Sequence, residues 1–118
     1  EQEKLVLVLG AMKELGDEAE RSHRDVGRIA AASRARGVFL IGEETAWTEE
    51  EMRRYGYAGR MYRSDSFEEL RNELLEFVDT GDTVLLKGSR AMELERLVEP
   101  LSKIEVHEVA DNTAGTND

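Results

Sequence analysis

The sequence lacks cysteine altogether, and its 118 residues include only two histidines, one proline and one tryptophan. Without cysteine, the protein has no disulfide, no catalytic thiol and no cysteine-ligated zinc site. The two histidines, His23 and His107, are far apart in the chain and lack the spacing of metal ligands, so no metal site is expected. No apolar run approaches the about 18 residues of a membrane span, and no signal peptide is visible.

Basic charge is also scarce. The chain has 16 lysines and arginines against 26 acidic residues, which gives a formal net charge of -10. Such an acidic surface argues against nucleic acid or an anionic membrane as the main partner. With 40% hydrophobic and 36% charged residues, the chain is expected to form one globular domain in the cytoplasm. Because it starts with Glu1 rather than methionine and enters an apolar run within four residues, we interpret it as a piece of a longer protein.

Three continuous apolar runs predict strands that are buried on both faces, as in parallel sheets: Leu5–Leu9, Val38–Ile41 and Thr83–Lys87. Each run is followed by a glycine. Arg60–Arg63 is a weaker candidate nearer an edge. Residues 104–109 alternate between apolar and polar side chains, which predicts a half-exposed edge or antiparallel strand.

Helical patterns separate these strands. The first helix is expected to end just before Gly37, which serves as its stop. Capping boxes at Thr48–Glu51 and Ser66–Glu69 predict the starts of a short helix and of a longer one. A fourth helix is expected to begin at about Ala91 and to end at Pro100.

This alternation predicts an α/β domain over residues 1–110, and residues 111–118, which lack an apolar pattern, are predicted to be a disordered tail. Right-handed crossovers turn such a chain into a Rossmann-like, three-layer open sheet, mostly parallel with one antiparallel edge strand. Ligands of open α/β sheets bind at the carboxyl ends of the strands. The sequence therefore predicts a crevice lined by Gly10–Met12, Gly42–Glu44, Ser64–Asp65 and Lys87–Arg90.

The segment Lys87-Gly88-Ser89-Arg90 offers the clearest chemistry among these strand ends. A glycine next to a helix start lets backbone N–H groups approach an anion, and Arg90 can hold a carboxylate or phosphate through its planar guanidinium. Alternatively, Lys87 only extends from the strand end and Arg90 is a solvated residue. Ser89 is expected to cap the helix, with ligand contact as an additional possibility.

The familiar nucleotide-binding and nucleophile motifs are missing. No Gly-x-Gly-x-x-Gly follows the first strand, and the chain has neither a P-loop nor a Gly-x-Ser-x-Gly elbow, so no catalytic residue is assigned to it. Glu14, in the loop after the first strand, either orders that loop or contacts a ligand. His23, early in the first helix, is either a structural or a functional histidine.

Gly10 and Met12, Glu14–Gly16 and His23 follow one another in the first third of the chain, and Lys87–Arg90 comes late. This order resembles the C-terminal domain of Mur ligases of the MurF type, whose pattern has a glycine, an acid and a methionine, then Glu-Leu-Gly, a helical histidine and Lys-Gly-Ser-Arg. The resemblance spans about residues 5–101.

The resemblance implies an ATP-dependent ligase that adds D-alanyl-D-alanine to UDP-N-acetylmuramoyl-tripeptide in peptidoglycan synthesis. In that family ATP and Mg²⁺ act in a central ATPase domain, where the tripeptide carboxylate becomes an acyl phosphate that the dipeptide amine attacks. The C-terminal domain is similar to a lid that brings the amino substrate and closes over the nucleotide. This chain alone is then expected to be inactive and to bind neither ATP nor Mg²⁺.

Carried onto this sequence, the resemblance assigns a substrate or domain-closure surface to six residues: Gly10, Met12, Lys87, Gly88, Ser89 and Arg90. Arg90 or Lys87 would contact the dipeptide carboxylate or the nucleotide, with Glu14 and His23 in support.

The chain also departs from the family. Ala11 stands where the family usually has an acidic residue, so any polar role there is lost or moved. The segment Asp-Ser-Tyr-Asn-Ala-Asn-Pro that opens the family's domain is absent, as are the UDP-sugar-binding and ATPase domains, so the domain is expected to be incomplete at its N-terminal end. The alternative hypotheses are a stand-alone α/β module that binds a small anionic ligand, and a protein-interaction domain.

Overall fold

A computed structural model describes residues 3–104 and 108–111. Its five strands form one sheet in the order β3-β2-β1-β4-β5, and every neighbouring pair is parallel. The strands are β1 Glu3–Gly10, β2 Ala35–Ile41, β3 Arg60–Ser64, β4 Thr83–Lys87 and β5 Glu108–Asp111. The helices are α1 Ala19–Ala32, α2 Thr45–Arg54, α3 Phe67–Phe77 and α4 Val98–Ser102. Short 3₁₀ turns occupy Gly16–Glu18, Arg90–Met92 and Leu94–Leu97.

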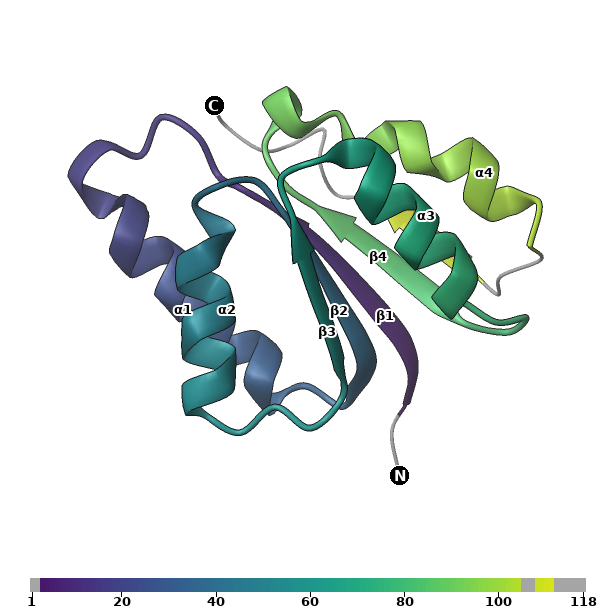
Figure 1. The fold of residues 1–118 in the computed structure, drawn as a ribbon, viewed down its shortest axis with the longest axis horizontal. Helices are drawn as coiled ribbons and strands as arrows, with labels where there is room; N and C mark the ends of the chain where they lie inside the picture. The colour runs from purple at the N-terminus through teal and green to yellow at the C-terminus, as the bar shows by residue number, and fades with distance from the viewer. Residues whose placement is uncertain (1–2, 105–107, 112–118) are drawn as a thin grey trace.

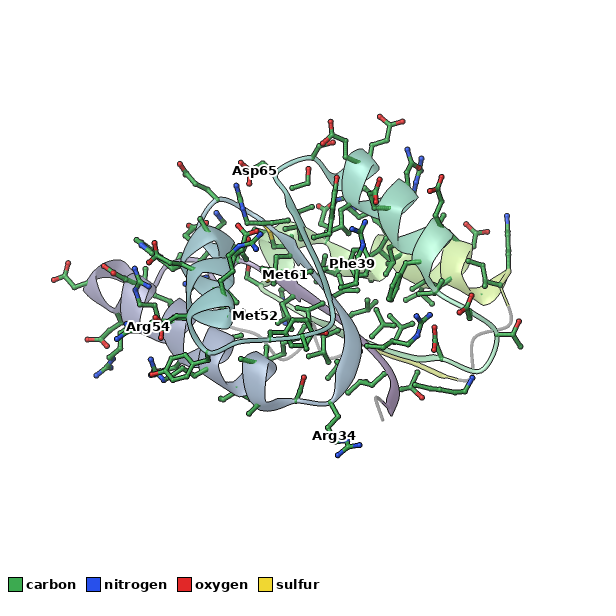
Figure 2. All side chains as sticks on the ribbon, turned by 60° about the horizontal axis from the view of Figure 1, so that its bottom comes forward. Arg34, Phe39, Met52, Arg54, Met61 and Asp65 are labelled. Carbon is green, nitrogen blue, oxygen red and sulfur yellow. The ribbon has the colours of Figure 1, made fainter. Side chains whose placement is uncertain are left out.

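Helices cover both faces of the sheet (Figure 1). Alternate residues of β1 point to opposite faces, so Leu7 and Leu9 join the core beneath α1 and α2, while Val6 and Val8 join the core beneath α3 and α4. Figure 2 shows Met52 of α2 and Phe39 of β2 in the interior, and neither side chain is exposed to solvent. The predicted Rossmann-like, three-layer fold is confirmed.

The strand order places a switch point between β1 and β4. The chain moves from β1 outward to β2 and β3, and then crosses back to β4 on the other side of β1. Leu9 and Lys87 are register partners, so the carboxyl ends of β1 and β4 are immediate neighbours. In open α/β sheets a crevice for ligands forms at such a point, because the loops leaving the two strands diverge to opposite faces.

The predicted antiparallel edge strand is wrong. β5 lies at the sheet edge, but it pairs in parallel with β4, with Glu108 opposite Thr83. The alternating pattern reports only that one side of a strand is exposed, and a parallel strand at an edge shares that property. Residues 105–107 of the predicted strand and 112–118 of the predicted tail lie outside the described residues, and Asp111 belongs to β5 rather than to a tail.

Two predicted helix boundaries also differ. Gly37 lies within β2 rather than after α1. A side chain would not fit at this position, because a Cβ there would lie 2.5 Å from Cε2 of Phe77. Thr48 lies inside α2 rather than at its start, and its hydroxyl donates a hydrogen bond to the carbonyl of His23 at 2.9 Å. The other capping box is confirmed, because Ser66 Oγ accepts a hydrogen bond from the Glu69 N–H at 3.2 Å.

The predicted fourth helix is replaced by 3₁₀ turns followed by the short helix α4, which contains Pro100 instead of ending before it. Proline is tolerated there because the N–H groups of the first turn have no partner within the helix. Glu93, between the two turns, has a left-handed backbone with φ 50°. Among the described residues, no helix is long and apolar enough to cross a membrane.

Candidate functional site

The carboxyl ends of β1 and β4 touch through their backbones. A Cβ on Gly88 would lie 3.0 Å from the Cα of Gly10 and 3.2 Å from its nitrogen, so a side chain would crowd the neighbouring backbone. Just beyond this contact, the Ser89 N–H donates a hydrogen bond to the carbonyl of Ala11 at 3.3 Å. The structure therefore brings together the two segments that the sequence singled out, Gly10–Met12 and Lys87–Arg90.

The end of β2 joins the same assembly. The Ala11 N–H donates to the carbonyl of Ile41 at 2.9 Å, and a Cβ on Gly42 would lie 2.6 Å from the Cβ of Ala11. Gly42 also has a left-handed backbone, with φ 112°. Ala11 is fully buried in this contact, so a packed methyl group fills this position and offers no polar group to a ligand.

Met12 is half-buried and His23 is buried, and they are joined directly. The Met12 N–H donates a hydrogen bond to Nε2 of His23 at 2.9 Å, and Nδ1 of His23 lies 2.7 Å from the carbonyl of Ala19. Both ring nitrogens therefore have protein partners, and His23 holds the loop after β1 rather than facing the crevice. Glu14, the other proposed supporting residue, is exposed and has a left-handed backbone with φ 61°.

Lys13 pairs with Glu44, at the start of α2, at 2.9 Å. Partial burial raises the pKa of Glu44, but the hydrogen bond from Lys13, a backbone hydrogen bond and the positive charge of Lys13 together outweigh this and lower the pKa below its usual value. The pair ties the β1 loop to the β2 loop beside a cavity of about 310 Å³ lined by Glu43, Glu44, Ala46 and Trp47. Sequence reasoning missed Lys13, because nothing local marks a partner 31 residues away.

Lys87 and Arg90 are the exposed cations of the β4 end. Lys87 shares a sheet face with its register partner Leu9, and it forms no ion pair with any residue that the structure describes. Arg90 opens the 3₁₀ turn that follows Ser89. Another cation that sequence reasoning missed is Arg63 of β3, whose guanidinium contacts the carbonyl of Gly42 at 3.3 Å and Asp65 at 2.8 Å. Because Arg63 also pairs with Glu49 at 3.7 Å, its charge is balanced by two carboxylates and the β3 end adds no net positive charge to the site.

Ser89 is completely buried, and its hydroxyl has no hydrogen-bond partner among the described residues. Ser89 occupies the N-cap position of the 3₁₀ turn, but the predicted capping hydrogen bond is not formed. The tight turn uses the carbonyl of Ser89 instead, which accepts from the Met92 N–H at 3.0 Å. A buried hydroxyl without a partner is unusual and calls for an explanation at this position.

The joined ends of β1 and β4, with the segments Gly10–Met12 and Lys87–Arg90, are called the strand-end surface below. No three acidic or histidine side chains within residues 3–104 gather as metal ligands. The exposed cations of this surface are Lys87 and Arg90, side chains of a type that pairs with carboxylates and phosphates.

Comparison with known proteins identifies the family of this chain. The sequence profile of the Mur ligase glutamate ligase domain matches residues 1–90. This chain belongs to the Mur ligase family. It is 41% identical over 104 residues to the UDP-N-acetylmuramoyl-tripeptide–D-alanyl-D-alanine ligase of Treponema pallidum (strain Nichols), covering 85% of this chain and 22% of that ligase. The corresponding Bacillus subtilis (strain 168) ligase is 33% identical over 98 residues, covering 83% of this chain and 21% of that protein.

A solved structure shows the same fold. The crystal structure of MurF ligase from Thermotoga maritima in complex with ADP superposes with a TM-score of 0.65 at 30% identity, over 86% of this chain and 22% of that one. The chain thus spans about a fifth of the length of the relatives it matches. The expected resemblance to the Mur ligase family is confirmed.

Proposed function

We propose that this chain is the C-terminal, amino-substrate-binding domain of an ATP-dependent ligase that adds D-alanyl-D-alanine to UDP-N-acetylmuramoyl-tripeptide. The observation that carries the proposal is the 41% identity to the Treponema pallidum ligase over 85% of this chain. The match covers only 22% of that ligase, so the complete activity requires the remaining domains. A cytoplasmic location follows from this proposal, because the nucleotide-linked substrate is cytoplasmic.

The strand-end surface is where we place the amino substrate. D-Alanyl-D-alanine carries a carboxylate, and Arg90 or Lys87 supplies the opposite charge beside it. The hydroxyl of Ser89 is buried and lacks a partner, so a ligand group could give it a hydrogen bond only after the Lys87–Arg90 segment moves to expose it. Gly10, Met12 and Gly88 shape the surface, which lies at the switch point of the sheet.

ATP and Mg²⁺ belong to the central ATPase domain in this proposal, where ATP would transfer its terminal phosphoryl group to the tripeptide carboxylate and leave as ADP. The work of this domain is to bind and orient the dipeptide so that its amine faces the activated carboxylate, and to exclude water when it closes.

A chimera tests the proposal. The matching segment of the Treponema pallidum ligase is replaced by this chain, and the control receives its own segment back through the same junctions. We expect the chimera to form the UDP-N-acetylmuramoyl-pentapeptide and to release ADP only when D-alanyl-D-alanine is present, with no product from L-alanyl-L-alanine. A folded chimera that binds ATP but forms no product, while the control remains active, would overturn the proposal.

The isolated chain provides the complementary measurement. If D-alanyl-D-alanine, acetate or phosphate binds the chain alone as tightly as it binds the chimera, the domain is a self-sufficient anion-binding module instead. We expect the dipeptide to bind the isolated chain more weakly, because the substrate surface of a lid is completed by the domain it closes on.

A further inference from the structure

His23 has a hydrogen-bonding arrangement that fixes its protonation state. The N–H of Met12 can only donate, so Nε2 of His23, 2.9 Å away, must accept and carries no proton. The carbonyl of Ala19 can only accept, so Nδ1, 2.7 Å away, carries the proton. The ring is 1% exposed, and water does not compete for these bonds. His23 is therefore neutral and held as the Nδ1–H tautomer.

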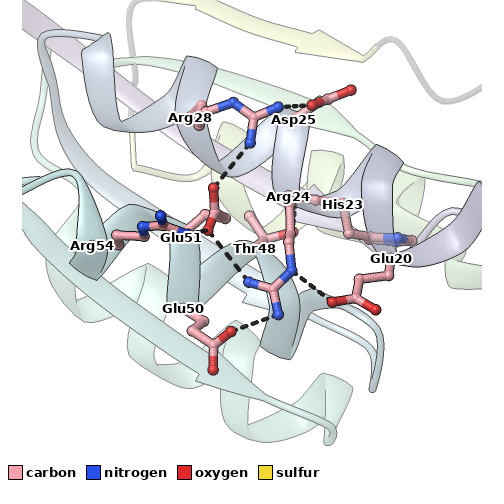
Figure 3. Close-up of polar contacts among 9 residues, drawn as sticks. All are labelled: Glu20, His23, Arg24, Asp25, Arg28, Thr48, Glu50, Glu51 and Arg54. Carbon is pink, nitrogen blue, oxygen red and sulfur yellow. Dashed lines mark hydrogen bonds and ion pairs between the residues drawn. The ribbon is translucent and has the colours of Figure 1, made fainter.

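The backbone of His23 is anchored from the second helix. Thr48 of α2 donates its hydroxyl proton to the carbonyl of His23, and both groups are buried. One turn along α1, Gly27 allows the helices to touch, because a Cβ there would lie 2.6 Å from the carbonyl of Thr48. Buried Glu51 then joins the two helices through ion pairs with α1 (Figure 3). His23 thus projects from a pair of helices that these contacts join, and its ring is held by the bonds to Met12 and Ala19.

The loop that His23 holds is otherwise irregular. Residues 11–15 connect β1 to a 3₁₀ turn, and both Glu14 and Gly16 adopt left-handed backbones, with φ 61° and 57°. Ala11, at the start of the loop, accepts the hydrogen bond from Ser89, and Met12 is the next residue. The bond to His23 is thus one residue away from the contact between the β1 and β4 ends.

We propose that His23 is a positioning residue for the strand-end site. Through its unprotonated Nε2 it fixes the backbone of Met12, and so holds the loop after β1 against the Lys87–Arg90 segment in the arrangement that receives the dipeptide. The effect on substrate rests on the proposed function, whereas the bond and the tautomer do not.

The first experiment uses the 118-residue chain itself. Nitrogen NMR of the His23 ring should show the Nδ1–H tautomer at neutral pH, with a coupling across the hydrogen bond between Nε2 and the Met12 amide nitrogen. A ring in the Nε2–H tautomer, or one that titrates freely with an exposed-histidine profile, would overturn the proposal.

Two substitutions distinguish the role of Nε2 from that of Nδ1. Asparagine in His23→Asn keeps a polar group near the Nδ1 position but leaves Met12 without an acceptor, whereas glutamine in His23→Gln places an oxygen near the Nε2 position. We expect hydrogen exchange of the Met12 amide to be about tenfold faster in His23→Asn than in His23→Gln. Arg21→Gln, on the same helix at a side chain that is 74% exposed, is the matched control and should leave exchange unchanged.

The second experiment uses the same substitutions in the chimeric ligase. We expect His23→Asn to raise the KM for D-alanyl-D-alanine about tenfold, with the KM for ATP unchanged and with recovery in His23→Gln. Thermal melting and the KM for ATP identify any variant that has lost its fold, and Met12 amide exchange with the NMR of the wild-type ring then carries the test. If the NMR result holds and both variants keep the wild-type KM for the dipeptide, His23 is structural and the proposal is wrong. An unsubstituted chimera without activity contradicts the proposed function instead, and the NMR result still decides whether His23 holds Met12.

Discussion

Arg36 donates hydrogen bonds to both carboxylate oxygens of Asp82, from Nη2 to Oδ2 at 2.5 Å and from Nε to Oδ1 at 3.0 Å. Asp82 is 1% exposed. It lies immediately before β4, and Arg36 is the second residue of β2. The pair therefore joins two strands at the end of the sheet opposite the candidate site. Arg36 also lies over the Phe77 ring, 4.1 Å from its centroid, so the ion pair packs against the core.

Loss of this ion pair should destabilise the fold in a pH-dependent way. Burial alone would raise the pKa of Asp82, but the hydrogen bonds from Arg36 and from the Asp79 N–H outweigh it and lower the pKa. A carboxyl whose pKa is lower in the folded state contributes stability above the unfolded pKa of about 4, and that stability is lost as the pH falls through the folded pKa.

We therefore expect Asp82→Asn to lower the free energy of unfolding by about 2–4 kcal/mol at pH 7, and by progressively less below about pH 4. Urea titrations across this pH range measure the difference. Asp65→Asn is the matched control, because Asp65 is 61% exposed in its pair with Arg63, and it should cost less than about 1 kcal/mol. An Asp82→Asn penalty that is the same at pH 7 and pH 3 would contradict this assignment.

The two glycines at the strand ends should differ in their tolerance of a methyl group. In Gly88→Ala the new Cβ meets the backbone of Gly10, which is fixed in the sheet, whereas in Gly10→Ala it meets Met92 and Leu94 side chains. Side chains can rotate away and a strand cannot. We expect Gly88→Ala to lower the free energy of unfolding by about 1–3 kcal/mol and Gly10→Ala to lower it by less. Chemical denaturation of both variants checks the order, and the reverse order would show that the strand ends do not touch as described.

The fold was largely predictable because its signals are local. Continuous apolar runs ending at glycine marked β1, β2 and β4, and the Ser66–Glu69 capping box marked the start of α3. The alternation of strands and helices was enough to place Gly10 and Lys87 together at the carboxyl ends of a parallel sheet, since right-handed crossovers leave few other arrangements. The resemblance of the motifs to Mur ligases then extended the prediction from an anion site to a family.

What failed depended on tertiary contacts. Thr48 looks like a helix cap, but its hydroxyl bonds the carbonyl of His23 on another helix, 25 residues away. Gly37 looks like a helix stop, but it lies within β2, where the Phe77 ring packs against it and leaves no room for a side chain. The direction of β5 could not be read from alternation. In the site, Lys13 was missed and Ser89 was expected to cap a helix, because both depend on how separate segments meet.

The buried hydroxyl of Ser89 gives a prediction that separates binding from stability. Since it has no partner within the described chain, Ser89→Ala should change the free energy of unfolding by no more than about 1 kcal/mol. If a bound ligand supplies the missing hydrogen bond, the same variant raises the KM for the dipeptide in the chimeric ligase. Unfolding titrations and steady-state kinetics of one protein preparation test both halves. A large loss of stability with normal kinetics would make Ser89 a structural residue only.

The central claim is that the joined ends of β1 and β4 form the surface that binds the amino substrate. Its most direct test is the steady-state kinetics of Arg90→Ala in the chimeric ligase. The control is Arg53→Gln, on an exposed side chain in the last turn of α2, away from the strand carboxyl ends. Loss of a charge-assisted hydrogen bond predicts a KM for D-alanyl-D-alanine or for ATP that is about 10–100-fold higher, with the control unchanged. Unchanged KM values for both substrates in Arg90→Ala would contradict the claim and remove Arg90 from the site.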